Sequence, residues 1–333
     1  MTRLPPLPMR PVYVEKLWGG QKLAALPAKR RAGHAPPAGV AVGESWEVAD
    51  LPEGQSTVDD HPICRDFAGL PLSAVVAHYG AALIGTAHPA GRFPILVKLL
   101  DAAEPLSVQV HPDSADAAAH PGTFSKDEAW LVVDAAADGA VLHGFASDDV
   151  TADAFVDAVR AGTPHALLRS VPVARGDVLH VSPGVVHAIG AGVVILEVQE
   201  PSDTTYRVWD FDRLDSSGNK RALHLNDALR VTRFGPQPPA LSSAVVDNEW
   251  QSTLCTTRSF AMRSIEVNGN RTRQLEVHPT HALVLHAESR DCVLVHDDVE
   301  LVIPRGGSVV LPASCGSVTF PACGAPARVI VMS

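Results

Sequence analysis

The chain has 333 residues, of which 46% are hydrophobic, so it can bury a sizeable core and form one large or two ordinary domains. Its 27 Lys and Arg against 37 Asp and Glu give a formal charge of −10. This acidic balance argues against a general binder of nucleic acid or of anionic membranes. Small anionic substrates remain compatible with it, because a few nearby cations outweigh a distant excess of negative charge.

The start of the chain is rich in Pro and has no apolar run of the kind found in signal peptides. No stretch of 18 apolar residues occurs, so we expect no membrane span. The five cysteines are scattered and form no Cys-x-x-Cys pair, which is typical of reduced thiols in a cytoplasmic protein. The oligomeric state cannot be read from these features.

Short apolar segments separated by Gly and Pro open the chain and predict strands at residues 11–14 and 43–48. Between them, residues 25–37 are rich in Ala, Pro and basic side chains, which predicts an exposed loop. Residues 72–84 have the pattern of a helix, with Ser73 as its cap.

The segment 106–111 is the most informative strand. Ser107, Gln109 and His111 alternate with three aliphatic residues, and a period of two puts the polar set on one face of a strand. Further strands are predicted at residues 93–100, 130–134, 140–145 and within 176–209, a short helix at 113–120, and two short helices within 150–170.

A Pro-rich segment at residues 235–241 predicts a linker. After it come only short apolar segments of even spacing, which favour a second β-sandwich or small barrel. These predicted strands cover residues 260–267, 273–277, 282–287, 292–295, 300–303, 308–311, 317–320 and 327–331.

Four potential metal donors stand out. Gln109 and His111 share a strand face, Glu128 follows His111 by 17 residues, and His187 comes after a Ser-Pro-Gly turn. Two imidazoles, a carboxylate and an amide oxygen suit zinc in an open catalytic site, and they could also hold manganese, cobalt or iron(II). Each residue taken alone has an ordinary structural explanation, since the chain has 15 His and Glu128 stands in a charged run.

Several longer motifs occur in one order along residues 11–230. They are Lys16-Leu-Trp-Gly-Gly, Gly43-Glu-Ser-Trp-Glu, Pro94-Ile-Leu-Val-Lys-Leu-Leu-Asp, Leu106-Ser-Val-Gln-Val-His-Pro-Asp, Lys126-Asp-Glu-Ala-Trp, Ser182-Pro-Gly-Val-Val-His-Ala and the segment from Glu197 to Arg213. As a set, they resemble the type I mannose-6-phosphate isomerases (phosphomannose isomerases) of the cupin superfamily.

The resemblance implies a mainly β protein with two cupin (jelly-roll) barrels: a catalytic domain at residues 1–235 with helical insertions, and a cupin-like domain at residues 242–333. It also implies a zinc-dependent aldose–ketose isomerase that interconverts mannose 6-phosphate and fructose 6-phosphate. One Zn²⁺ per chain would be held by Gln109, His111, Glu128 and His187. Arg207 would be the active-site arginine, and Ser107 and Lys126 would contact the substrate phosphate.

Arg207 cannot serve as an ordinary base, because its guanidinium stays protonated near neutral pH. We therefore expect it to orient substrate and stabilise charge, with a structural ion pair to Asp203, Asp210 or Asp212 as the alternative. The proton-transfer base stays open, with these candidates: Glu197, Glu47, Lys98, Asp203 and a metal-bound water.

Two other functions fit a metal-binding cupin. One is an iron-dependent oxygenase that uses the same ligands, and the other is a non-catalytic sugar-phosphate-binding protein. Ser107, Lys126 and Arg207 favour a sugar-phosphate site over an oxygenase, and the presence of all four ligand candidates favours an enzyme over a binding protein.

Overall fold

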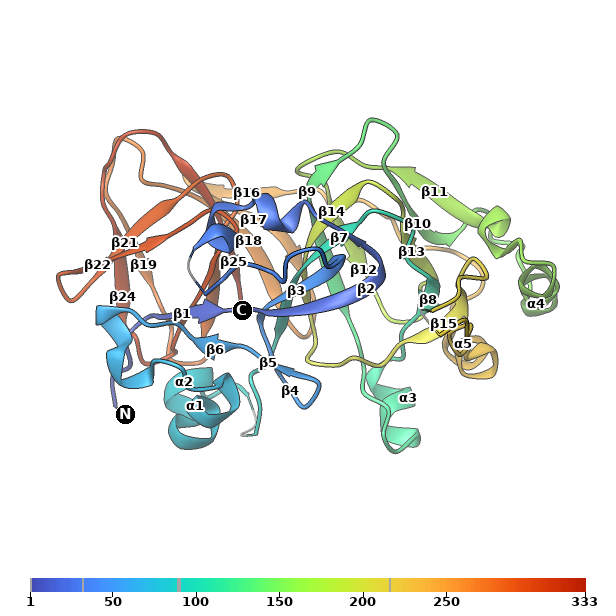
Figure 1. Cartoon of the computed structure of the whole chain (residues 1–333), viewed down its shortest axis with the longest axis horizontal. Helices are drawn as coiled ribbons and strands as arrows, with labels where there is room; N and C mark the ends of the chain where they lie inside the picture. Colours follow the sequence, from blue (N-terminus) through green and yellow to red (C-terminus); the bar gives the residue numbers. More distant parts are fainter. Residues whose placement is uncertain (1, 32, 89–90, 216) are drawn as a thin grey trace.

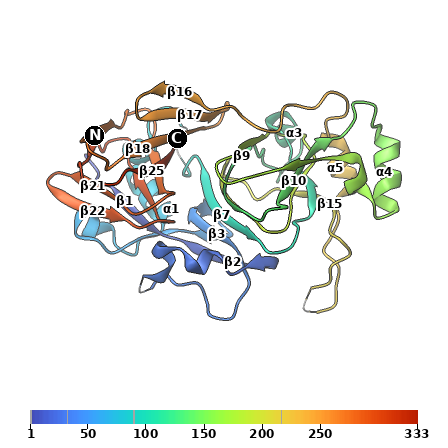
Figure 2. The same ribbon diagram turned by 90° about the horizontal axis from the view of Figure 1, so that it is seen from above.

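The computed structural model describes residues 2–31, 33–88, 91–215 and 217–333. The chain folds mainly into β-strands, as predicted. Figure 1 shows the C-terminal strands (orange and red) gathered at one end of the molecule and the green and yellow segments at the other. The view from above in Figure 2 shows the same separation, with β2 and β3 (blue) between the two ends.

Two sheets build the first half of the molecule. The six-stranded sheet contains, in spatial order, β12 (Val178–Val181), β9 (Glu128–Ala135), β14 (Val193–Gln199), β7 (Leu96–Ala102), β2 (Val12–Gly20) and β3 (Val42–Val48). The five-stranded sheet contains β11 (Leu168–Pro172), β10 (Ala140–Phe145), β13 (His187–Ile189), β8 (Val108–Val110) and β15 (Tyr206–Trp209).

Alternation along the central strands gives the six-stranded sheet two distinct faces. Its front face, which carries Leu100, Trp130 and Ile195, packs with Val141 and Ile189 of the five-stranded sheet. Its back face belongs to a different core, which is shared with the C-terminal strands. The front face therefore borders the candidate site, and the back face borders the second half of the molecule.

Two further sheets build the second half. An eight-stranded sheet contains β16 (Val245–Asn248), β17 (Gln251–Thr256), β18 (Ala261–Val267), β25 (Ala327–Met332), β20 (Leu283–Ala287), β23 (Ser308–Leu311), β1 (Leu7–Arg10) and β6 (Thr57–Val58). A four-stranded sheet contains β19 (Arg273–Glu276), β24 (Ser317–Phe320), β21 (Cys292–His296) and β22 (Val299–Ile303). A separate apolar core joins these two sheets.

The first strand of the chain belongs to the C-terminal sheet. β1 pairs antiparallel with β23, with Leu7 opposite Val310 and Pro8 opposite Val309. Hydrogen bonding therefore crosses the predicted boundary between residues 1–235 and 242–333, and those bounds stay a prediction. Among the described residues each sheet is open, without strand pairing that closes a barrel.

Helices are short and peripheral: α1 (Leu72–Tyr79), α2 (Ala81–Ile84), α3 (Ser114–Ala119), α4 (Ala152–Arg160) and α5 (Leu225–Val231). The helix predicted over residues 72–84 is interrupted at Gly80, whose φ of 45° L side chains rarely adopt. Pro71, not Ser73, occupies the cap position, so the predicted cap is wrong. The remaining short elements are β4 (Asp50–Leu51), β5 (Gly54–Gln55) and the 3-10 turns η1 (Leu23–Ala25), η2 (Pro27–Arg30), η3 (Pro62–Phe67) and η4 (Pro164–Leu167).

The exposed loop predicted for residues 25–37 is wrong in its central part. Lys29 is 1% exposed and its Nζ donates to both carboxylate oxygens of Glu47, at 2.5 and 2.7 Å. His34 is buried as well. The basic and Pro-rich composition predicted exposure to solvent. The buried carboxylate of Glu47 on β3 instead pairs with Lys29 and offsets the cost of burying its charge. Residue 32 lies outside the described residues.

Candidate metal and substrate site

Three of the four predicted donors converge from three strands. His111 follows the last residue of β8, Glu128 begins β9 and His187 begins β13. Their donor atoms all lie within 4.8 Å of one another. Glu128 Oε1 is 3.3 Å from His187 Nε2 and 3.6 Å from His111 Nε2. All three side chains are buried.

Backbone carbonyls orient both imidazoles. His111 Nδ1 donates to the carbonyl of Thr204 at 3.0 Å, and His187 Nδ1 donates to that of Val185 at 2.9 Å. This leaves an unprotonated Nε2 on each ring, next to Glu128 Oε1. Burial lowers the pKa of His111 to about 3 and also lowers the pKa of His187, so both rings are neutral, as metal ligation requires.

Glu128 supplies a negative charge that lacks its full set of partners. Burial alone would raise the pKa of this carboxyl, but the Lys126 ammonium group brings it well below its usual range. Lys126 Nζ is 3.1 Å from Oε2. Neither carboxylate oxygen has a hydrogen bond of acceptable geometry among the described residues. Two neutral imidazole nitrogens around an under-satisfied buried carboxylate fit a divalent metal ion.

Gln109 lies beside this group. Its Nε2 is 3.2 Å from His187 Nε2, and its Oε1 accepts from Ser107 Oγ at 3.4 Å. Rotating the Gln109 amide by 180° exchanges its oxygen and nitrogen. The oxygen would then point to the His111, Glu128 and His187 cluster. Gln109 therefore stays a predicted fourth ligand that the structure brings within reach.

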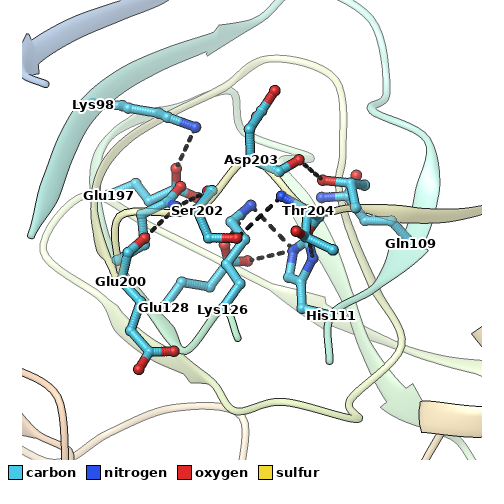
Figure 3. Close-up of polar contacts among 12 residues, drawn as sticks. Lys98, Gln109, His111, Lys126, Glu128, Glu197, Glu200, Ser202, Asp203 and Thr204 are labelled. Carbon is cyan, nitrogen blue, oxygen red and sulfur yellow. Dashed lines mark hydrogen bonds and ion pairs between the residues drawn. The ribbon is translucent and has the colours of Figure 1, made fainter. Parts of the chain in front are cut away.

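A cavity of about 190 Å³ opens next to the cluster, between the two sheets of the first half. Ser107, Lys126 and Arg207 line it, so the structure brings together all seven predicted site residues. Figure 3 shows Lys126, Glu128 and His111 meeting at one point, with Glu197 and Lys98 beside them. Lys126 Nζ is 3.2 Å from His111 Nε2, which places this ammonium group at the metal end of the cavity.

Glu197 lies on the cavity wall with an unusual ionisation. Burial, followed by the negative charge of Glu128, raises the pKa of Glu197 to about 7. Trp130 Nε1 donates to its Oε1 at 3.1 Å, and Lys98 Nζ is 3.6 Å from its Oε2. A carboxyl group that titrates near neutral pH is suited to moving protons.

The other candidate bases divide by position. Lys98 and Asp203 line the cavity, whereas Glu47 lies outside it in the buried ion pair with Lys29. The position of Glu47 argues against a role in proton transfer.

The alternative role for Arg207 was a structural ion pair with Asp203, Asp210 or Asp212, and the described residues contain no such ion pair. Asp210 pairs with Arg213 and Arg221, and within the described ranges no carboxylate oxygen lies within 4.0 Å of the Arg207 guanidinium. Arg207 Nη1 donates to the carbonyl of Ala222 at 3.1 Å, while its Nε is buried and makes no hydrogen bond within the described part of the chain.

Sequence reasoning missed part of the cavity wall. Glu44 and Lys16 occur in the motifs near the start of the chain but received no role there. Burial would raise the pKa of Glu44, but Lys98 and Lys16 lower it to about 2. Arg221 and His224 lie in the irregular segment after β15, and no pattern in the sequence distinguished them.

The comparison with known proteins agrees with this geometry. The family model for the phosphomannose isomerase type I catalytic domain matches residues 7–132. The mannose-6-phosphate isomerase of Streptococcus mutans is 32% identical over 95% of this chain and 95% of its own length. Mannose-6-phosphate isomerase ManA of Bacillus subtilis is 31% identical over 93% of this chain and 94% of its own.

Solved structures give the same result. The mannose 6-phosphate isomerase from Bacillus subtilis superposes with a TM-score of 0.85 and 28% identity, covering 99% of both chains. A mannose 6-phosphate isomerase bound with zinc and yttrium shares the fold, with a TM-score of 0.73, 17% identity and 98% of both chains covered. With relatives above 30% identity along almost the whole sequence, the chain belongs to the type I phosphomannose isomerase family.

Proposed function

We propose that this chain is a metal-dependent aldose–ketose isomerase that interconverts mannose 6-phosphate and fructose 6-phosphate. The observation that carries the proposal is the buried His111, Glu128 and His187 cluster, whose carboxylate accepts no hydrogen bond from the described residues beyond its ion pair with Lys126. It lies beside a cavity that holds a carboxyl group titrating near pH 7 and several cations. The family relationship supports the same activity and substrate pair.

The residues that would hold the metal are His111, Glu128 and His187, with Gln109 as the fourth, and we propose one Zn²⁺ per chain. Zinc accepts this mixture of nitrogen and oxygen donors with an open position. When bound, the ion would supply a Lewis acid that polarises the substrate carbonyl and stabilises an oxyanion.

We assign proton transfer to Glu197. In the aldose-to-ketose direction its carboxylate takes the proton from C2, and the same proton returns to C1. Removal of the C2 proton moves its electron pair to O1 and leaves a cis-enediolate. One proton then passes from O2 to O1, and return of the first proton to C1 forms the C2 carbonyl of the ketose. Trp130 and Lys98 hold the carboxylate in place by contacts of 3.1 and 3.6 Å.

The cations of the cavity divide between the two ends of the substrate. Lys126 lies at the metal end, which favours contact with the reacting oxygens, although the family pattern also associates it with phosphate. Arg207, Ser107 and Arg221 line the rest of the cavity wall. We assign to them the orientation of the substrate and the binding of its phosphate. A small-molecule sugar phosphate is the only partner in this proposal.

The proposal also includes the finer fold assignment. The five- and six-stranded sheets would form the catalytic cupin unit within residues 1–235. The other two sheets, apart from the added strands β1 and β6, would form the cupin-like unit of residues 242–333. Each pair of sheets shares one apolar core, which supports a jelly-roll sandwich in each half. A cytoplasmic location fits the buried, unpaired thiols of Cys64, Cys255, Cys292 and Cys315.

One assay tests the function directly. Interconversion of the two sugar phosphates is measured before chelation, after chelation and after zinc is added back. We expect loss of turnover with the metal and recovery with zinc. Absence of turnover in fully metallated protein would refute the proposal. Binding of the sugar phosphate without turnover would indicate a binding protein, and metal-dependent oxygen consumption would indicate an oxygenase.

A further inference from the structure

A second cavity, of about 390 Å³, lies on the back face of the six-stranded sheet. Leu99 of β7 and Val194 of β14 line it, whereas Lys98 and Glu197 of the same two strands belong to the front-face cavity. The opposite wall comes from the C-terminal half, with His286 on β20 and Arg305 in the turn before β23. No step of the proposed isomerisation uses this space.

Among the described residues, the charged side chains that line the back cavity are paired, with Arg305 as the exception. Lys22 Nζ donates to Asp134 Oδ2 at 2.8 Å, and Arg175 forms an ion pair with Glu288. Arg305 has no carboxylate oxygen within 4.0 Å in the part of the chain that the structure describes. Its Nε is buried and has no hydrogen-bond partner in residues 2–31, 33–88, 91–215 and 217–333. The cavity therefore offers one guanidinium in excess.

The rest of the lining is apolar or neutral. Leu23, Leu26, Leu99, Val133 and Val194 provide aliphatic surface. His286 is 2% exposed, and its Nδ1 is 2.9 Å from Ser308 Oγ. Burial lowers the pKa of His286 to about 3, so the ring adds a polar edge without a second positive charge. The volume falls within the range of about 300–1,000 Å³ that is typical of small-molecule sites.

We propose that the back cavity binds a small monocarboxylate with an aliphatic body. A single unpaired guanidinium matches one negative charge, and its planar fork fits the two oxygens of a carboxylate. The aliphatic lining matches a short hydrocarbon chain. This site lies across the sheet from the metal cluster and does not depend on the proposed isomerase activity.

Hexanoate is the probe for this site, and isothermal titration calorimetry of the full-length, zinc-loaded protein measures its binding. Acetate keeps the charge but lacks the chain, and hexan-1-ol keeps the chain but lacks the charge. We expect hexanoate to bind at least about tenfold more tightly than either, because each buried methylene and each charged hydrogen bond contributes separately. Saturation with fructose 6-phosphate should leave hexanoate binding unchanged.

Substitutions of Arg305 locate the site. Arg305→Gln should weaken hexanoate binding about tenfold or more without changing the affinity for hexan-1-ol, which has no carboxylate for the guanidinium to bind. The hexanoate affinity of Arg305→Lys should lie between those of Arg305→Gln and the unmodified protein, because lysine keeps the charge but loses the two parallel N–H donors of the guanidinium. Arg160→Gln, an exposed arginine on α4, is the matched control and should bind like the unmodified protein. Equal binding by Arg305→Gln, equal binding of acetate, or no measurable binding of hexanoate would overturn the proposal.

Discussion

The candidate metal group is arranged before any ion arrives. Each histidine has its Nδ1 hydrogen fixed by a backbone carbonyl, at 3.0 Å for His111 and 2.9 Å for His187. Its burial keeps the ring neutral. Little side-chain entropy is left to lose when a metal binds, which favours tight and specific ligation.

Replacing His111 with Ala should abolish tight metal binding and isomerase activity together, because one of three buried donors is lost. Metal content after dialysis and the rate of mannose 6-phosphate isomerisation measure the two effects. His120→Ala is a suitable control, since this residue lies at the end of α3 outside the cavity. A His111→Ala protein that keeps stoichiometric zinc would contradict the ligand assignment.

Arg207→Ala should behave differently. We expect zinc content to stay at that of the unmodified protein and kcat/KM to fall about a hundredfold or more, the usual loss when a charge-stabilising donor is removed. Metal analysis and steady-state kinetics on the same sample separate the two quantities. Unchanged kcat/KM would show that the guanidinium has only a structural role.

Glu197 predicts the pH dependence. Burial and the charge of Glu128 raise its pKa to about 7, and a base must be ionised, so kcat/KM should rise with pH through that region and then level off. A bound metal offsets the charge of Glu128, which moves this limb to a pH at or below 7. Glu197→Gln should lower turnover by about 10² to 10⁴ and remove the limb. A profile that Glu197→Gln leaves intact would assign proton transfer elsewhere.

At the scale of single elements, β14 shows how one strand serves two purposes. Glu197 faces the front cavity, while its neighbour Leu196 is 0% exposed in the core between the two halves. The period of two thus separates chemistry from packing within adjacent residues.

Leu196→Ala should therefore lower the free energy of unfolding by about 2–5 kcal/mol while leaving kcat/KM within about twofold at temperatures where the protein is folded. Urea titration and steady-state kinetics measure the two quantities. If Leu196→Ala instead removed activity without changing stability, the division between the two faces would be wrong.

The elements that could be predicted from sequence are those with a strong local signal. The period of two at 106–111 placed Ser107, Gln109 and His111 on one face, and all three now border the cluster or its cavity. The short C-terminal strands lie at the predicted positions. The signal was weak for α5, β16 and β17. All four residues of β16 are exposed on a sheet edge, so no buried face left a pattern to detect.

At the scale of the whole molecule, the features that could not be predicted from sequence are those that depend on contacts between distant parts of the chain. The pairing of β1 with β23 joins residues about 300 positions apart, and nothing local in Leu7–Arg10 specifies that partner. Arg221 and His224 reach the cavity only because the segment after β15 folds back on it. The metal donors were predictable because each of them stands in a family motif. Arg221 and His224 stand in none of those motifs.

The crossing strand gives a test of the architecture. Deleting residues 2–10 removes β1 and leaves β23 without one of its neighbours. We expect faster amide hydrogen exchange at Val309 and Val310 and a lower melting temperature, with less change in the hairpin of β21 and β22. Unchanged protection of β23 in the truncated protein would show that β1 contributes nothing to that sheet.

The same pairing sets an order of events during synthesis. Ribosomes add roughly 5–20 residues per second, so about 15–60 seconds separate the emergence of β1 from that of β23, its partner near residue 310. During that interval the first strand has no finished sheet to join. The eight-stranded sheet can be completed only after β25 has left the ribosome, so the first strand made finds its place in a sheet that includes the last strand made.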